Sequence, residues 1–494
     1  MSELTLPLEI DENSRIPVKK QLCDQLIDLI INLKIMPGQM LPSSRELATA
    51  LGISRATTVR AYKELIARGY IETIEGVGTF VCKRFITPVE DVDKTVTLKL
   101  SRYAYHLMML KPDRLTPHDF PELQHGASPI ELLPFKQWKN ALNKAQETFR
   151  KNPELIDFGT EPFGYIPLRR AIAGYLKRSS MIDISEDNLI VCSSSVYLLE
   201  LVSELLIDPA TPVAFPEPGP LFARDIFNKL GARIIPVPVD EEGLIVNDLK
   251  QLKELPEIVY LNSSHQEPTG ACLSMERRKD LIDWAQKHSI MIVEDDFDSQ
   301  FRYQGARQAP LRALSAGANI VYLSSFWRTL YPLINVSYMV VPDMIIPFLK
   351  QSWYLTQGGF HTHFPIFEEK ALEIFINQGD YEKHLANSSS ILADRLRNCI
   401  YQLTFNFGKT ILVSQESSSY HIFIRFLNPE IKENHILEMA ANAGLPLLSA
   451  RGNYLLSKNE NAYLIPFAYL EKSDLSEKIS RFKNLMIKLG LVST

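Results

Sequence analysis

The stretch PSSRELATALGISRATTVRAYKELIARGYIETIEGVGTFV, residues 42–81, predicts two short helices followed by a hairpin. Ser43 precedes a helical pattern, and Glu46 three positions later completes the pair that caps a helix N-terminus. Gly52 allows a sharp turn, and Ser54 is placed to cap a second helix that runs to Arg68. Residues 70–74 and 79–81 have the composition of short strands around a glycine-rich turn.

A further helix is predicted in front of this stretch, over residues 16–33. Its apolar residues recur at helical spacing, and Met36-Pro37-Gly38 then marks a turn. In the helix begun at Ser54, the residues expected to face inward are Val59, Tyr62, Leu65 and Ile66. Three helices and a hairpin in this order predict a winged helix-turn-helix, whose third helix enters the major groove of DNA. The alternative is a small helical domain with no role on DNA.

Charge is distributed unevenly along the chain. Residues 15–84 carry eleven lysines and arginines against six acids, while the 494 residues together have a net charge of −5. One small basic unit on a larger acidic body favours a DNA-facing domain fused to a domain with another role. The length also favours two or three domains rather than one.

Residues 42–81 resemble the DNA-binding domain of GntR-type regulators, which implies double-stranded operator DNA as a partner. The resemblance implies that the residues facing DNA include Arg45, Arg55, Thr57 and Arg60, with Gly78 at the tip of the wing. Ser54 and Thr57 are expected to bind phosphate, which positions a protein without reading sequence. Arg55 is the candidate for base readout, because a guanidinium pairs bidentately with guanine. For a single arginine, the alternative is a solvated surface charge.

The rest of the chain predicts an α/β domain with a mostly parallel sheet. Apolar runs at 188–192, 212–215, 234–237, 258–261, 290–293 and 320–323 are separated by helical patterns. After about residue 350 the chain is helix-rich, with strands near 420 and 464, which predicts a smaller C-terminal α/β lobe. The predicted domains are therefore 1–82 and 116–494, joined by a linker at 83–115 with a short helix near 98–110.

This larger part resembles the fold-type I, aspartate aminotransferase-like domain that binds pyridoxal phosphate (PLP). The landmarks are ELLPFKQW (131–138), FGTEPFGYIPLRRAIAGYL (158–176), IPVPVDEEGL (235–244), SSHQEPTG (263–270), EDDFDSQFRY (294–303) and SSFWRTLYP (324–332). Together with the N-terminal unit, the chain resembles the MocR/GabR family of regulators over almost its whole length. The resemblance implies a homodimer that places two DNA-binding units on paired half-sites.

The lysine that the resemblance requires for a Schiff base with PLP is missing. The family has a Ser-Phe-Ser-Lys-Thr-Leu segment, and this chain has Arg328 where that lysine belongs. A guanidinium stays protonated and delocalised, so it cannot form the aldimine. No lysine lies between Arg312 and Lys350, so a small shift in register does not supply one.

Other positions of the implied cofactor site have also changed. Asn335 stands where the family has an arginine that binds the phosphate, and Ser194 and Ser195 lie in the turn where the family has a glycine near the phosphate. Pro220 stands where the family has an aromatic residue that stacks on the cofactor ring. Phe297 stands where the family has a tyrosine that hydrogen-bonds the ring oxygen. Only the acid expected at the pyridine nitrogen is kept, as Asp295. It could instead serve only to end a strand, and His265 could be an ordinary loop residue.

These changes predict a transcription regulator whose aminotransferase-like domain is not an enzyme and holds no covalent cofactor. Arg328, Ser195 and Ser325 suggest a cationic, hydroxyl-lined cavity for non-covalent PLP or another anionic metabolite. The alternatives are a working PLP-dependent aminotransferase with a fused DNA-binding domain and a dimerisation scaffold without ligand. Scattered cysteines and the absence of a long apolar run favour a cytoplasmic protein without a membrane partner; no metal site is predicted.

Overall fold

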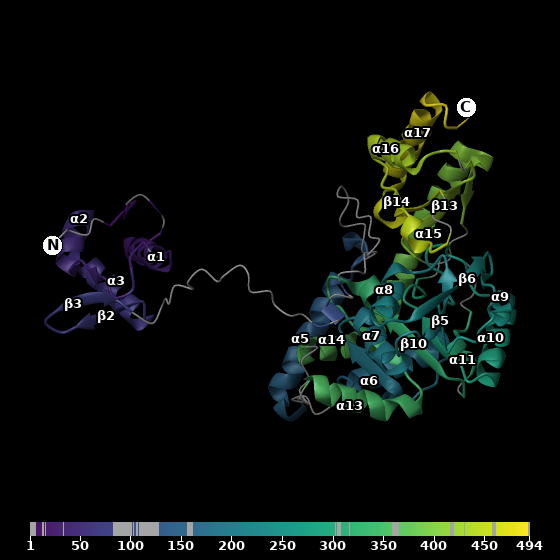
Figure 1. Cartoon of the computed structure of the whole chain (residues 1–494), viewed down its shortest axis with the longest axis horizontal. Helices are drawn as coiled ribbons and strands as arrows, with labels where there is room; N and C mark the ends of the chain where they lie inside the picture. Colours follow the sequence, from purple (N-terminus) through teal and green to yellow (C-terminus); the bar gives the residue numbers. More distant parts are fainter. Residues whose placement is uncertain are drawn as a thin grey trace. The chain divides into compact units, whose positions relative to one another are not determined.

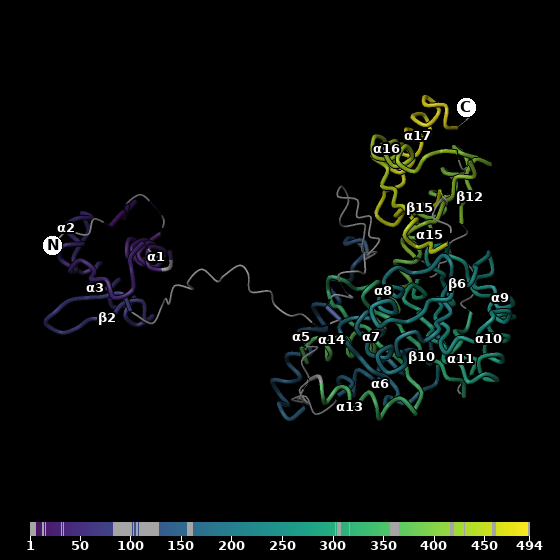
Figure 2. Tube along the Cα trace, in the orientation of Figure 1, coloured from purple at the N-terminus to yellow at the C-terminus, as the bar shows by residue number. Residues whose placement is uncertain are grey.

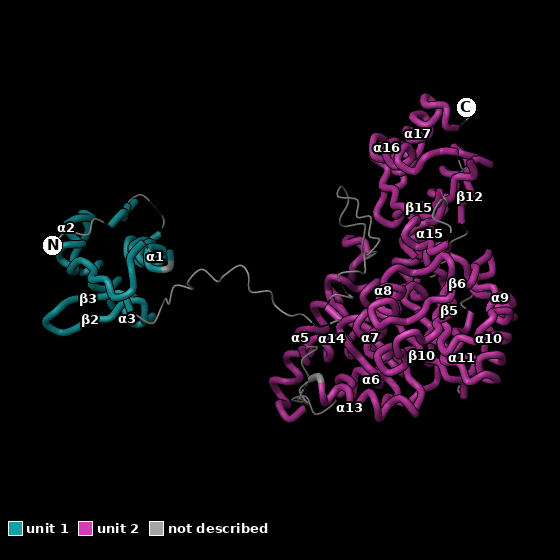
Figure 3. Tube along the Cα trace, in the orientation of Figure 1, with its two compact units in different colours: residues 1–101 teal, residues 102–494 magenta. Residues whose placement is uncertain are grey.

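The computed structural model describes residues 6–11, 14, 16–32, 34–82, 101, 103–104, 107, 128–155, 162–301, 303, 308–315, 317–357, 365–414, 419–428, 430–456 and 461–492. The chain divides into two compact units, Met1–Ser101 and Arg102–Thr494 (Figure 3). Of the predicted linker at 83–115, only residues 101, 103, 104 and 107 are described, so its predicted helix lies largely outside the described residues.

Unit 1 contains the predicted helices and hairpin. Its elements are α1 (Val18–Ile31), β1 (Met40–Leu41), α2 (Ser44–Leu51), α3 (Arg55–Ala67), β2 (Ile71–Ile74) and β3 (Gly78–Val81). The strands form an antiparallel sheet in the order β1-β3-β2. The capping box is confirmed, because Ser43 accepts from the amide of Glu46 and the Glu46 carboxylate accepts from the amide of Ser43. Gly52 ends α2 in the left-handed region, at φ 67°.

The core of unit 1 joins all three helices to the sheet. It includes Leu22, Leu26, Leu47, Leu65 and Val81. The inward face predicted for α3 was partly wrong: Ile66 is 41% exposed and Val59 is only half-buried. Thr58 and Ala61 are buried in their place, so the buried face of α3 is rotated about the helix axis relative to the predicted one, and α1 and α2 pack against this helix.

Unit 2 is built on an eight-stranded sheet in the order β4-β11-β10-β9-β8-β5-β6-β7. Its strands are β4 (Leu189–Cys192), β5 (Pro212–Glu217), β6 (Arg233–Asp240), β7 (Gly243–Leu244), β8 (Ile258–Leu261), β9 (Met291–Asp295), β10 (Ile320–Ser325) and β11 (Ser337–Val340). Pairing is parallel from β10 through β9, β8 and β5 to β6, and antiparallel at β11 and β7. The mostly parallel sheet and all six predicted strands are confirmed.

Helices cover both faces of this sheet (Figure 1). One face packs on α7 (Ser195–Leu206) and α8 (Leu221–Lys229), and Phe215 and Leu323 lie in that cluster. The other face packs on α9 (Val246–Lys250), α10 (Met275–Lys287) and α11 (Leu311–Leu314), where Ala214 and Ile292 are buried. Apolar side chains therefore alternate between two cores, as in a parallel sheet buried on both sides.

The remaining helices of unit 2 extend this framework. They are α5 (Phe135–Lys151), α6 (Ile166–Ser180), α12 (Trp327–Leu330), α13 (Ile346–Gln357) and α14 (Ile366–Asn377). Long helix α15 (Asp380–Phe407) leads into a smaller lobe, which can be followed as the yellow-green end of the trace in Figure 2. That lobe contains β12 (Ile411–Val413), β13 (Ile422–Phe426), β14 (Leu448–Ser449), β15 (Ala462–Ile465), α16 (Glu433–Ala443) and α17 (Lys472–Lys488). The predicted C-terminal α/β lobe is confirmed.

In the part of the chain that the structure describes, no helix combines the length and the apolar character that a membrane span requires.

Candidate functional site

The start of α3 is fixed by two hydroxyl groups. The Ser54 hydroxyl accepts from the amide of Thr57 at 3.1 Å, and the two side-chain hydroxyls lie 2.8 Å apart. Ser54 is exposed and Thr57 is half-buried. Both hydroxyls therefore stabilise the helix end, which the predicted DNA-binding mode would place against the phosphate backbone.

Three of the predicted DNA-facing side chains are exposed cations on α2 and α3. Arg45 lies on α2, Arg55 is the first residue of α3, and Arg60 lies one turn further on. The Arg60 Nε donates to the carbonyl of Ala56 at 3.2 Å, which holds this side chain along its own helix. Among the described residues none of the three forms an ion pair, so their charges are available to DNA.

The wing is the hairpin of β2 and β3. Gly78 pairs with Ile74 and adjoins the turn at 75–77. It adopts φ 151°, a backbone conformation that favours glycine, whereas an added Cβ would meet only the end of the flexible Met40 side chain. The hairpin has exposed Glu72 and Glu75, and no lysine or arginine lies between residues 70 and 82.

In unit 2, three predicted segments meet at one edge of the sheet. Leu261 of β8 pairs with Glu294 of β9, and Leu323 of β10 pairs with Asp295. Because these strands are parallel, the segments that follow them, at 262–270, 295–301 and 324–332, emerge at the same carboxyl edge. This is the edge where ligands bind in open α/β sheets.

Arg328 lies in α12, directly after β10, and is held by two neighbours. Its Nε lies 3.0 Å from Oδ1 of Asp298, and its guanidinium carbon lies 4.7 Å from the centre of the Phe297 ring. The second oxygen of Asp298 lies 3.5 Å from Nδ1 of His265. His265, Phe297 and Arg328 are therefore brought together around Asp298, a residue that the sequence analysis did not single out.

Asp295 ends β9 and is buried, with 3% of its surface exposed. Its Oδ2 accepts from the hydroxyl of Tyr260 at 2.7 Å. Burial raises the pKa of Asp295 to about 7, while the hydrogen bond from Tyr260 lowers it and the nearby carboxylates of Glu267, Asp296 and Asp298 raise it further. The carboxyl group is therefore poised to exchange a proton near neutral pH.

The other predicted pocket residues have mainly local partners. Ser194 caps α7 by accepting from the amide of Tyr197, and Ser195 is the first residue of that helix. Pro220 is buried at the start of α8, and Asn335 is half-buried just before β11. The Ser325 hydroxyl donates to the carbonyl of Val336 and accepts from Ser337 and from the amide of Trp327. Ser325 is thus part of the strand junction.

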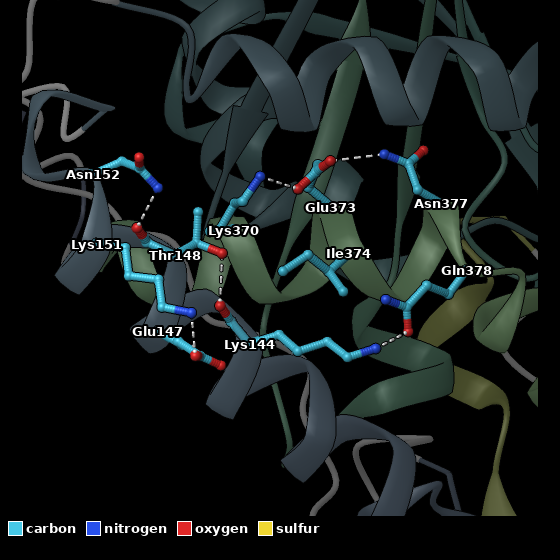
Figure 4. Close-up of a pocket in the computed structure, with 10 residues that line it drawn as sticks. All are labelled: Lys144, Glu147, Thr148, Lys151, Asn152, Lys370, Glu373, Ile374, Asn377 and Gln378. Atoms are coloured by element: carbon cyan, nitrogen blue, oxygen red, sulfur yellow. Dashed lines mark hydrogen bonds and ion pairs between the residues drawn. The ribbon is translucent and has the colours of Figure 1, made fainter.

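A groove elsewhere on unit 2 lies between α5 and α14, with a volume of about 470 Å³ (Figure 4). Its charged side chains are paired: Lys151 lies 2.6 Å from Glu147, and Lys370 lies 2.7 Å from Glu373. Lys144 donates to Gln378 at 3.1 Å. None of the predicted pocket residues lines this groove, and we assign it no role.

Two family models match the chain, one in each unit. Residues 18–81 match the bacterial regulatory proteins of the gntR family, and residues 125–327 match the class I and II aminotransferases. The pyridoxine biosynthesis regulator PdxR of Corynebacterium glutamicum is 30% identical over 344 residues, covering 68% of this chain and 69% of that protein. This chain belongs to the MocR-type regulators of the GntR family. Its membership makes it a DNA-binding transcription regulator.

Two further relatives match this MocR-type regulator over almost its full length. The regulator YhdI of Bacillus subtilis is 26% identical, covering 96% of this chain and 97% of that protein. The probable rhizopine catabolism regulatory protein MocR of Rhizobium meliloti is 24% identical, covering 98% and 96%.

Solved aminotransferases share the fold of unit 2. The multiple substrate aminotransferase of Thermococcus profundus superimposes with a TM-score of 0.68 at 19% identity, covering 79% of this chain and 97% of that one. The kynurenine aminotransferase of Pyrococcus horikoshii gives 0.67 at 22% identity, covering 83% and 98%. The predicted fold-type I architecture is confirmed.

Asp298, which joins Arg328 and His265 in this MocR-type regulator, was not singled out from the sequence, and neither was the nearby Glu267. Both lie in the motifs that carried the resemblance, EDDFDSQFRY and SSHQEPTG. The sequence did contain a signal for Asp298. Arg328 was expected in the pocket, and an arginine in a largely buried position requires a partner of opposite charge. No comparable signal marks Glu267, whose position beside the other acids depends on the pairing of β8 with β9.

We predict that Arg55→Ala weakens binding to a specific operator by about 1–3 kcal/mol, because Arg55, the first residue of α3, is the side chain expected to read a base. The operator can be selected from random DNA with the wild-type chain, and binding measured by fluorescence anisotropy. Arg68→Ala, at the other end of α3, is the matched control and should leave affinity nearly unchanged. Equal losses for both variants would contradict the placement of the recognition helix.

We also predict that Asp295→Asn stabilises the chain increasingly as the pH rises. With its pKa near 7, Asp295 keeps its proton when folded, whereas in the unfolded chain it ionises near a pKa of about 4. Unfolding therefore releases a proton between these values, and the free energy of unfolding of the wild type falls as the pH rises through them.

Asparagine cannot ionise, so the melting temperature of Asp295→Asn should rise relative to that of the wild type from about pH 4 to pH 7. Above about pH 7 the difference between the two melting temperatures should stay constant. The exposed control Asp187→Asn should show no such widening. A constant difference for Asp295→Asn would contradict the raised pKa.

Proposed function

We propose that this regulator uses its aminotransferase-like domain for dimerisation and for non-covalent ligand sensing, and that the domain does not catalyse transamination. The observation that carries the proposal is the position of Arg328, at the residue where the family forms its Schiff base, paired with Asp298 and lying on the ring of Phe297.

The side chains at this edge do not fit covalently held PLP. An aldimine requires an amine, and Arg328 offers a delocalised guanidinium instead, here 3.0 Å from the carboxylate of Asp298. Phe297 has no hydroxyl for the ring oxygen, and Asn335 has no charge for the phosphate. A ligand held here is therefore held by hydrogen bonds and charge alone.

Helix α13 supports the proposed homodimer. Met344, just before the helix, and Phe348 and Leu355 within it are 63%, 65% and 77% exposed. Their spacing places them along one face, opposite buried Leu349 and Trp353. Exposed apolar stripes of this kind mark protein contacts, and homodimer interfaces are more apolar than the rest of a surface. A second copy of this chain is the partner that pairs two DNA-binding units.

Sensing requires that the ligand favours one arrangement of the two DNA-binding units over another. A ligand with equal affinity for both arrangements would change nothing, however tightly it bound. The competing function is a working aminotransferase fused to a DNA-binding domain, and it requires an amine at the site.

The first test treats the full chain with PLP and then borohydride, and maps any pyridoxyl group by mass spectrometry. We expect no stoichiometric adduct on any lysine of the wild type, because residues 313–349 contain none. Arg328→Lys and an authentic fold-type I aminotransferase serve as comparisons. A stoichiometric pyridoxyl group on one lysine of the wild type would overturn the proposal in favour of the enzyme.

The second test is Leu355→Asp, which places a charge in the proposed dimer contact. We expect this variant to be monomeric by light scattering at concentrations where the wild type is a dimer, because an unpaired charge is costly in an apolar interface. Leu456→Asp, at a leucine that is 72% exposed in the smaller lobe, is the matched control and should stay dimeric. A dimeric Leu355→Asp variant, or a monomeric wild type, would contradict the assignment.

A further inference from the structure

The entry of α2 joins three parts of unit 1. Strand β1 ends at Leu41, Pro42 follows, and Ser43 caps α2. β1 pairs with β3 of the wing, with Leu41 opposite Thr79. Pro42 is therefore the link between the wing sheet and α2, the helix on which Arg45 is exposed.

Helix α3 holds this link through one side chain. The hydroxyl of Tyr62, on α3, donates to the carbonyl of Pro42 at 2.8 Å. The amide of Ser43 belongs to the same peptide group, and it donates to the Glu46 carboxylate at 2.8 Å. The peptide group that leads into α2 is thus bonded on one side by α3 and on the other by α2 itself.

The hydroxyl of Tyr62 does more than fill the core. The residue is 6% exposed, and its ring packs in the core of unit 1. A phenylalanine ring would fill nearly the same volume, whereas a buried tyrosine hydroxyl requires a hydrogen-bond partner. Burial raises the pKa of this hydroxyl, and the nearby Glu46 raises it further, so the group stays protonated and remains a donor. The tyrosine therefore adds a directed contact between α3 and the start of α2.

We propose that Tyr62 is a positioning residue for DNA binding, which fixes α2 relative to α3 through its hydrogen bond to Pro42. The inference rests on the predicted placement of Arg45 and Arg55 against DNA. It concerns unit 1 alone, so it stands or fails independently of the ligand sensing proposed for unit 2.

Fixing the two helices affects the two kinds of DNA contact differently. A bidentate contact with a base requires a guanidinium held in one geometry, so a shift of α2 against α3 weakens such contacts. Contacts with phosphates carry no sequence information, and long side chains can make them from many arrangements. Loss of the Tyr62 hydroxyl should therefore weaken binding to an operator more than binding to random DNA.

The test is Tyr62→Phe in the full chain, with the operator selected by the wild type and random-sequence DNA of equal length compared by fluorescence anisotropy. We expect operator affinity to fall about fivefold, the bias that one neutral hydrogen bond supplies. Affinity for random DNA should fall less than about twofold. Amide hydrogen exchange should become faster at residues 42–48 and stay unchanged in α1.

Cys23→Ala is the matched control, because it also removes a buried contact with α3. The Cys23 thiol, on α1, donates to the carbonyl of Ala61 at 3.7 Å. This contact does not involve the entry of α2, so the ratio of operator affinity to random-DNA affinity should stay at the wild-type value. An unchanged ratio in Tyr62→Phe, or an equal fall of the ratio in both variants, would overturn the proposal.

A double-mutant cycle with Arg45→Ala shows whether Tyr62 acts through α2. Once the contact of Arg45 is gone, loss of the hydroxyl should lower operator affinity by less than about twofold. Losses that multiply independently would overturn the proposal. So would an Arg45→Ala chain that binds the operator like the wild type, because α2 would then offer no contact to position. Fast exchange throughout unit 1 in Tyr62→Phe would also overturn it, because the hydroxyl would then be required for folding.

Discussion

The strands β8, β9 and β10 are covered by helices on both faces, and this constraint decides where the polar chemistry of unit 2 can lie. Their side chains alternate between two apolar cores, so charged groups are tolerated only at the strand ends or in full partnership with others. Parallel pairing then brings the ends of all three strands to one edge. Glu294 illustrates the alternative: it lies within β9 and is accommodated by Ser263 and by two backbone amides.

The pair of Arg328 and Asp298 links the changes at this edge. An arginine in a largely buried position needs a carboxylate, and Asp298, three residues beyond Asp295, provides it. Phe297 gives the guanidinium an apolar, electron-rich surface, which a cation favours. Arg328, the Phe297 ring and Asp298 are thus parts of one arrangement. We infer that this arrangement serves recognition instead of bond making.

Local signals made the fold predictable. Ser43, Glu46 and Gly52 mark helix ends through hydrogen bonds within a few residues, so the sequence contains the whole interaction. Ile66 was misplaced because helical periodicity gives the spacing of a buried face without its direction, which α1 and α2 determine. The partnership of Arg328 with Asp298 could not be read from the sequence, because it depends on the register between β9 and β10, which are distant in sequence.

The acidic wing of unit 1 affects how DNA binding responds to ions. Glu72 and Glu75 are exposed on a hairpin without lysine or arginine, so the wing displaces no condensed counterions from the phosphate backbone. The release of those ions then comes from the helices, where Arg45, Arg55 and Arg60 are exposed. We therefore expect a shallower dependence of DNA binding on salt than a wing with a basic tip would give. Weaker binding to random DNA would leave more of the regulator free to reach its operator among the large excess of non-operator sequence in a genome.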